Sequence, residues 1–141
     1  MPGAELTTSV RGGRVVLTLP GDLNVTGAAD AEAAITALMA RGQSLVIDMS
    51  APDFIDCGSL GALLRVQRLA RDGCDVALAA PQPYVRRLLA LTGADEVFQV
   101  DPSVAAAVAG LAGRQRRYPW PRLAVRTARP WRAAPSRTGT G

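Results

Sequence analysis

The apolar residues near the start of the chain have the spacing of two β-strands. Residues 14–19 (Arg-Val-Val-Leu-Thr-Leu) are rich in β-branched and apolar side chains, which is typical of a strand. Residues 5–10 fit an edge strand before it, and Arg-Gly-Gly at 11–13 fits the turn between the two. Because Pro-Gly-Asp at 20–22 ends the second strand, we predict a β-hairpin over residues 5–19.

The pattern then changes to helical spacing. We predict a helix with Thr26 as its N-cap that runs to about Ala40. Residues 44–48 form a short apolar run that ends in an aspartate, which is typical of a strand buried on both faces of an α/β sheet. A turn at 56–58 opens a second predicted helix, which continues to about Arg71. The apolar side chains expected to face inward from these two helices are Ala31, Ile35, Leu38 and Met39 in the first and Leu60, Leu63, Leu64 and Ala70 in the second.

The last part of the pattern repeats this alternation of strand and helix. We predict a strand over 75–79, a helix over 83–91, a strand over 97–100 and a helix over 104–111 that Gly110 and Gly113 bring to an end. Helical connections allow neighbouring strands to run parallel. The predicted fold class is therefore α/β, with a small mixed β-sheet packed against four helices.

Charge divides the chain into two parts. Residues 1–112 contain eight arginines and all twelve acidic residues, a net charge of −4, whereas residues 113–141 contain eight arginines and no acidic residue. Helical periodicity also stops after Gly113. We therefore predict a folded domain over 1–112 and an Arg/Pro-rich tail over 113–141 that is disordered.

The tail combines arginine with tyrosine and tryptophan, a composition that suits nucleic acid or an anionic membrane surface. One interpretation is a weak nucleic-acid contact through Arg114, Arg116, Arg117 and Arg122. The other is a solvated extension with no partner.

Composition also limits the chemistry. The chain has no histidine, and all sixteen basic residues are arginine, which excludes Ser-His and Cys-His catalysis, histidine metal ligands and lysine Schiff bases. Asp22, Asp53 and Asp56 are expected to lie near one another at one end of the sheet, where they suit a contact surface or local caps better than catalysis. We expect a protein that is not an enzyme and has no cofactor or metal. The sequence contains no apolar run of membrane-spanning length and no recognisable signal peptide, so we expect a cytoplasmic location.

The apolar run Leu-Val-Ile-Asp-Met-Ser at 45–50 is followed by Phe-Ile-Asp-Cys-Gly-Ser-Leu-Gly at 54–61. With these motifs, residues 45–64 resemble the STAS domain of anti-anti-sigma factors. In that family a buried strand ends in a loop, and an Asp-Ser-[Ser/Thr/Ala]-Gly-Leu turn opens the next helix. Gly-Asp-Leu at 21–23 looks like the family's acidic loop, and residues 85–93 look like its third helix. The resemblance covers about residues 4–112.

This resemblance implies a STAS domain over residues 1–112 that acts as an anti-sigma factor antagonist. Such a protein binds an anti-sigma factor that is also a serine kinase of the histidine-kinase-like ATPase type. Binding frees a sigma factor and so regulates transcription by partner switching. The implied docking residues are Asp22, Asp56, Cys57, Gly58 and Ser59, together with the exposed side of the helix that follows. The alternative is a STAS-type sensory or scaffold module that binds a small ligand or nucleotide.

One residue departs from the family pattern, because Cys57 stands where the family has its phosphorylated serine. The protein could dock constitutively, controlled by its expression or by competition. Ser59 could instead accept the phosphate, although its side chain points about 200° around the helix axis from that of Cys57. Cys57 could also be a redox sensor, since cysteines at helix N-termini carry more thiolate, or simply a small hydrophobic residue.

Overall fold

The computed structural model describes residues 6–70 and 74–117, which form a five-stranded sheet with five helices. The strands are β1 (Thr7–Arg11), β2 (Arg14–Thr18), β3 (Leu45–Asp48), β4 (Val76–Ala79) and β5 (Gln99–Asp101). The helices are α1 (Val25–Ala40), α2 (Cys57–Gln67), α3 (Pro83–Thr92), the single turn α4 (Ala94–Val97) and α5 (Val104–Arg117). The predicted order of nine elements is confirmed, and α4 is an addition to it.

The sheet is mixed, as predicted. Its strand order is β1-β2-β3-β4-β5, with β1 antiparallel to β2 and every other neighbouring pair parallel. The carboxyl ends of β2 to β5 therefore lie at one edge of the sheet. We call this the carboxyl edge: the last residues of these four strands and the loops 19–24, 49–56, 80–82 and 102–103.

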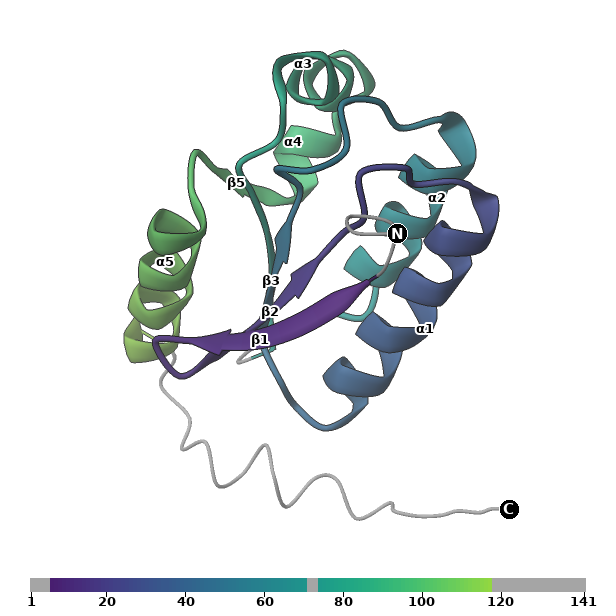
Figure 1. Ribbon diagram of the computed structural model, residues 1–141. Helices are drawn as coiled ribbons and strands as arrows, with labels where there is room; N and C mark the ends of the chain where they lie inside the picture. Colours follow the sequence, from purple (N-terminus) through teal and green to yellow (C-terminus); the bar gives the residue numbers. More distant parts are fainter. Residues whose placement is uncertain (1–5, 71–73, 118–141) are drawn as a thin grey trace, which may run out of the picture.

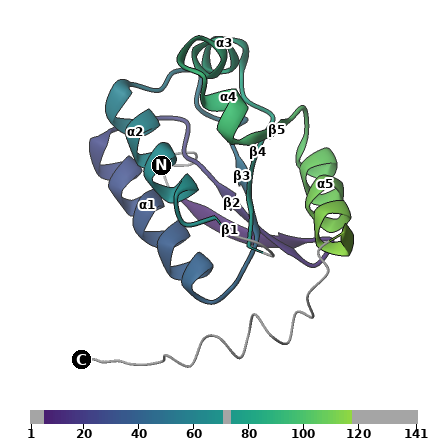
Figure 2. The ribbon, with the colours of Figure 1, turned by 180° about the vertical axis from the view of Figure 1, so that it is seen from behind.

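Helices cover both faces of the sheet (Figures 1 and 2), but the two sides differ in size. Successive strand side chains point to opposite faces, so Leu45 and Ile47 face one layer and Val46 faces the other. The larger core lies against α1 to α4, whereas α5 packs through Ala107 and Leu111 on small strand residues. Because β3 is covered on both sides, Leu45, Val46 and Ile47 are all fully buried, as its apolar run predicts.

The first helix begins two residues earlier than its predicted cap allows. Asn24, rather than Thr26, is the N-cap, and its side-chain oxygen accepts a hydrogen bond from the Gly27 amide at 2.8 Å. The side chain of Leu23, next to Asn24, is buried, which constrains the loop just before the helix. Asparagine and threonine are both good caps, and tertiary packing decides between them.

The second helix ends at Gln67, before the predicted end near Arg71, which lies outside the described residues. Its inward side contains Leu60 and Leu63, as predicted, but not Leu64, which is 36% exposed. The prediction for Leu64 was wrong because the buried stripe on this helix is narrow and continues through Val66 instead.

The carboxyl-terminal elements also differ from the prediction in their bounds. Gly93, with φ of 80°, ends α3 and is followed by the single turn α4, so the last strand starts at Gln99 instead of residue 97. Helix α5 continues through Gly110 and Gly113 to Arg117. Gly110 does not stop the helix; a Cβ there would meet the end of the Gln99 side chain, which would have to move aside. The division into a 1–112 domain and a tail stays a prediction, and residues 118–141 lie outside the described ranges.

None of the helices in the described part of the chain is both long and apolar enough to cross a membrane.

Candidate functional site

The loop between β3 and α2 is held firmly on the carboxyl edge. The Met49 amide donates to the Ala79 carbonyl at 2.9 Å, which continues the parallel pairing beyond the end of β3. The Gln82 side-chain amide, from the loop after β4, donates to the carbonyls of Ser50 and Ala51 at 2.8 and 3.1 Å. Ile55, with 1% exposure, anchors the end of the loop in the core. The loop is therefore constrained, and it fixes the position at which α2 begins.

Asp56 caps α2. Its Oδ1 accepts a hydrogen bond from the Ser59 backbone amide at 2.7 Å, the geometry of an N-cap. This backbone hydrogen bond lowers the pKa of the Asp56 carboxyl from its ordinary value. The Ser59 hydroxyl lies close enough to lower that pKa further, although it does not reach hydrogen-bond geometry. Asp56 is therefore ionised at neutral pH and fixes the direction in which α2 begins.

The two candidate modification residues lie on opposite sides of the first turn of α2. The side chain of Cys57 is exposed and its thiol is free, and Gly58 beside it is also exposed. Ser59 is only 1% exposed, and its hydroxyl has no hydrogen-bond partner within the described residues. The expected angular separation between Cys57 and Ser59 is therefore present. The hydroxyl of Ser59 is thus much less accessible to a modifying enzyme in this structure than the thiol of Cys57, and phosphorylation of Ser59 stays a prediction.

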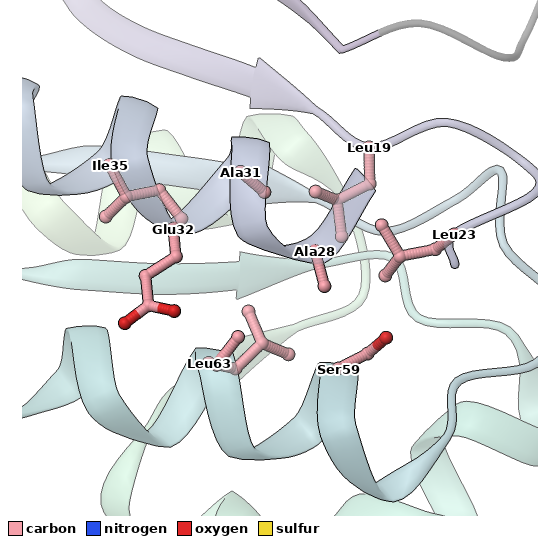
Figure 3. Close-up of a pocket in the computed structure, with 9 residues that line it drawn as sticks. Leu19, Leu23, Ala28, Ala31, Glu32, Ile35, Ser59 and Leu63 are labelled. Carbon is pink, nitrogen blue, oxygen red and sulfur yellow. The ribbon is translucent and has the colours of Figure 1, made fainter. Parts of the chain in front are cut away.

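A small cavity lies behind the buried side of this turn, between α1 and α2 (Figure 3). It has a volume of about 240 Å³, which includes space open to solvent, and most of its lining is apolar. The lining residues are Leu19, Leu23, Ala28, Ala31, Glu32, Ile35, Ser59, Ala62 and Leu63. Leu23, which follows Asp22 in the loop after β2, and Ser59, in the first turn of α2, both line this cavity, so the two segments are neighbours.

Glu32 is the ionisable residue of this lining, and it is paired. Both of its carboxylate oxygens accept hydrogen bonds from Arg65 of α2 at 2.9 Å, which links the two helices. The hydrogen bond from Arg65 lowers the pKa of Glu32, and the same bond raises the pKa of Arg65. Sequence analysis did not identify this pair, because nothing in the sequence indicates which faces of α1 and α2 meet.

The predicted acidic residues lie on the carboxyl edge, where they join two more. Asp22 and Asp53 are exposed in the loops after β2 and β3, and Asp56 follows in the second of these loops. Asp48 and Asp101 are the last residues of β3 and β5. The carboxyl edge thus has five aspartates and no arginine, although the chain has sixteen arginines. In the described part of the chain, no group of three or more cysteine, aspartate or glutamate side chains is arranged to hold a metal ion.

Two aromatic residues beside the turn were missed by the sequence analysis. Phe54, in the loop before Asp56, stacks on Tyr84 in the first turn of α3, with ring centroids 5.5 Å apart and planes 24° from parallel. Both side chains are exposed, by 55% and 46%. In the sequence Phe54 and Ile55 are adjacent and apolar, so a pattern alone could not show which one faces the solvent.

The comparisons with known proteins agree with this architecture. The sequence model of the STAS domain matches residues 5–107. A crystal structure of an anti-sigma factor antagonist from Mycobacterium paratuberculosis superposes with a TM-score of 0.70 at 26% identity, over 79% of this chain and 97% of that one. No curated protein matches the sequence.

Two further solved structures share the fold at lower identity. An anti-sigma-factor antagonist (STAS) domain protein from Planctomyces limnophilus has a TM-score of 0.67 at 20% identity, over 76% of this chain and 97% of that one. A putative anti-sigma factor antagonist from Thermotoga maritima has a TM-score of 0.66 at 20% identity, over 76% and 94%. The chain therefore belongs to the STAS domain family, with the fold of its anti-sigma factor antagonists.

Proposed function

We propose that this protein is an anti-sigma factor antagonist that docks onto an anti-sigma factor of the serine-kinase-like ATPase type and so frees a sigma factor. The observation that carries the proposal is the exposed pair Cys57 and Gly58 at the start of α2, directly after the ionised cap Asp56. On a STAS fold this turn is where the family resemblance puts the partner contact. Asp22, in the neighbouring loop, adds negative charge to the same edge.

Docking of this protein is independent of phosphorylation at the family position. Cys57 provides a thiol where a serine hydroxyl would accept phosphate, and Ser59 is buried. Control by expression or by competition between partners is consistent with both facts. A redox role for Cys57 has less support, because Cys74, the other cysteine of the chain, is fully buried and its thiol donates to the carbonyls of Met39 and Gln43, so it is not placed as a resolving partner for Cys57.

The test is direct binding to purified anti-sigma factors of the ATPase type from the organism that encodes this chain. We expect one of them to bind the wild-type protein and to release its sigma factor in a competition assay. The Cys57→Glu variant, which adds a negative charge at the same exposed position, should bind at least tenfold more weakly, since a phosphate at this turn acts through its charge. The proposal fails if no ATPase of this type binds the wild-type protein.

A small-ligand or nucleotide module is the second candidate, and the cavity between α1 and α2 is the observation that favours it. Its enclosed space is only about that of one water molecule, far too small for an ordinary small-molecule ligand. Its ionisable side chain, Glu32, is already paired with Arg65. These two facts support docking ahead of ligand sensing.

We also propose a weak nucleic-acid contact at the end of the chain. Arg114, Arg116 and Arg117 belong to the last turns of α5, whereas Arg122 lies outside the described residues. Removing residues 118–141 and replacing the three helical arginines by glutamine should abolish a salt-sensitive mobility shift of single-stranded RNA. An unchanged shift would contradict this contact.

A further inference from the structure

The stacked pair Phe54 and Tyr84 is an unusual use of aromatic residues in this chain. Only 4% of the sequence is aromatic, and the described part contains three such residues. Phe98 is buried, but Phe54 and Tyr84 lie side by side on the surface at about half exposure. Aromatic side chains contribute strongly when they are buried, so their exposure together indicates a surface that a partner covers.

Both rings are held in place by the parts of the chain that carry them. Phe54 precedes Ile55, which is 1% exposed, and Tyr84 precedes Val85, which is fully buried. The hydrogen bonds from Gln82 to the Ser50 and Ala51 carbonyls fix the loop of Phe54 against the start of α3. An aromatic pair on a constrained backbone loses little freedom on binding, which favours its use as an anchor.

The pair lies on the same surface as the proposed docking turn. Phe54 is three residues before Cys57, and the cap Asp56 lies between them. An anti-sigma factor that contacts Cys57 and Gly58 would therefore need only a slightly larger contact surface to cover the aromatic pair as well. The position of the pair makes the docking surface wider than the start of α2.

The charge around the pair indicates the chemistry of its partner. Asp53 directly precedes Phe54 and Asp56 follows it, whereas the exposed Arg86 and Arg87 come after Tyr84 in α3, so the negative charge lies on the Phe54 side of the pair. This charge opposes the phosphates of a nucleic acid and complements a cationic group. An arginine or lysine of a protein partner can lie over an aromatic face while its neighbouring apolar side chains cover the rings.

We infer that Phe54 and Tyr84 form an aromatic platform that anchors the anti-sigma factor through a segment carrying a cation flanked by apolar side chains. This inference rests on the proposed function and extends it, since it assigns much of the affinity to residues outside the turn at 56–59. Interfaces of this kind commonly depend on a few aromatic anchors near their centre.

The test measures the affinity of the full-length chain for the purified anti-sigma factor that binds the wild-type protein. Phe54→Ala and Tyr84→Ala should each weaken binding at least tenfold, and the double variant should lose less than the product of the two effects, because the rings support one another. Phe54→Leu, which keeps an apolar side chain but removes the ring, should give an intermediate loss. The matched controls are Val10→Ala in β1 and Val97→Ala in α4, which are also exposed and should change binding less than twofold.

The outcomes separate this inference from the function on which it rests. Wild-type binding that Phe54→Ala and Tyr84→Ala leave unchanged would overturn the platform and leave the docking function intact. Failure of every anti-sigma factor to bind the wild-type protein would overturn both. A shift of labelled single-stranded RNA that Tyr84→Ala abolishes would assign the platform to nucleic acid and so contradict the inference. Circular dichroism of each variant should show a native spectrum, since about half of each side chain is exposed and neither belongs to the buried core.

Discussion

The two sides of the eleven-residue helix α2 differ in burial and therefore in their role. The inward side carries Ser59, Leu60 and Leu63, which fill the core and the wall of a small cavity. The outward side carries Cys57 and Leu64, which are exposed. The inward side therefore fixes the position of the helix, and the outward side can change chemically without cost to the fold. That difference is consistent with our proposal that Cys57 stands where the family resemblance places a serine.

The largest effect should come from cutting a side chain on the inward side. Leu63→Ala leaves a void in the core, so we expect a loss of about 2–5 kcal/mol in the free energy of unfolding. Leu64→Ala, one residue further along on the outward side, should cost less, about 1 kcal/mol, because its side chain is only partly covered. Urea denaturation of both variants measures the contrast. Equal losses of stability would contradict the description of one side of α2 as buried in the core and the other as exposed.

A smaller effect is expected at Ser59, the polar residue on the inward side. Its hydroxyl is buried without a hydrogen-bond partner in the described part of the chain, so removing it relieves a desolvation penalty that outweighs the small stabilisation the hydroxyl gives to the Asp56 carboxylate. Ser59→Ala should leave stability unchanged or raise it by up to about 1 kcal/mol. Thermal unfolding measures this. A clear loss of stability would mean that the Ser59 hydroxyl makes a hydrogen bond in solution, which would contradict its description as a buried group without a partner.

The smallest effect should appear in the pH dependence of stability. The pKa of Asp56 is lowered from its ordinary value near 3.8 by the Ser59 amide, so the folded state binds a proton there less readily than the unfolded state. The stabilising contribution is fully present above about pH 4 and is lost as the pH falls through the lowered pKa of the folded state. Asp56→Asn keeps the cap acceptor but does not titrate, so its melting temperature should fall less steeply than that of the wild type below pH 4. Identical slopes would contradict the assignment of Asp56 as an ionised cap.

Much of the architecture could be predicted because it depends on local patterns. The uninterrupted apolar run at 45–47 predicts a central strand, and the aspartate at 56 predicts a helix start, and both are confirmed. The start of α1 could not be settled in this way, because Asn24 and Thr26 are both suitable caps.

The features of the surface were harder to predict, because they depend on how distant segments meet. Phe54 and Tyr84 are thirty residues apart, and only the pairing of β3 with β4 brings their loops together. The pairing of Glu32 with Arg65 depends in the same way on the packing of α1 against α2. Leu64 was placed inward because its spacing fits the buried stripe, but that stripe is narrower than the spacing alone implies.

The central claim is that the exposed turn at Cys57 docks onto an ATPase-type anti-sigma factor without acting as a phosphorylation switch. The most direct measurement incubates wild-type protein and the Cys57→Ser variant with the bound anti-sigma factor and ATP, then maps phosphate by mass spectrometry and measures affinity. We expect both proteins to bind beforehand, only Cys57→Ser to acquire phosphate, at residue 57, and only that variant to lose affinity afterwards. Stoichiometric phosphate on Ser59 of the wild-type protein, with loss of binding, would contradict the account.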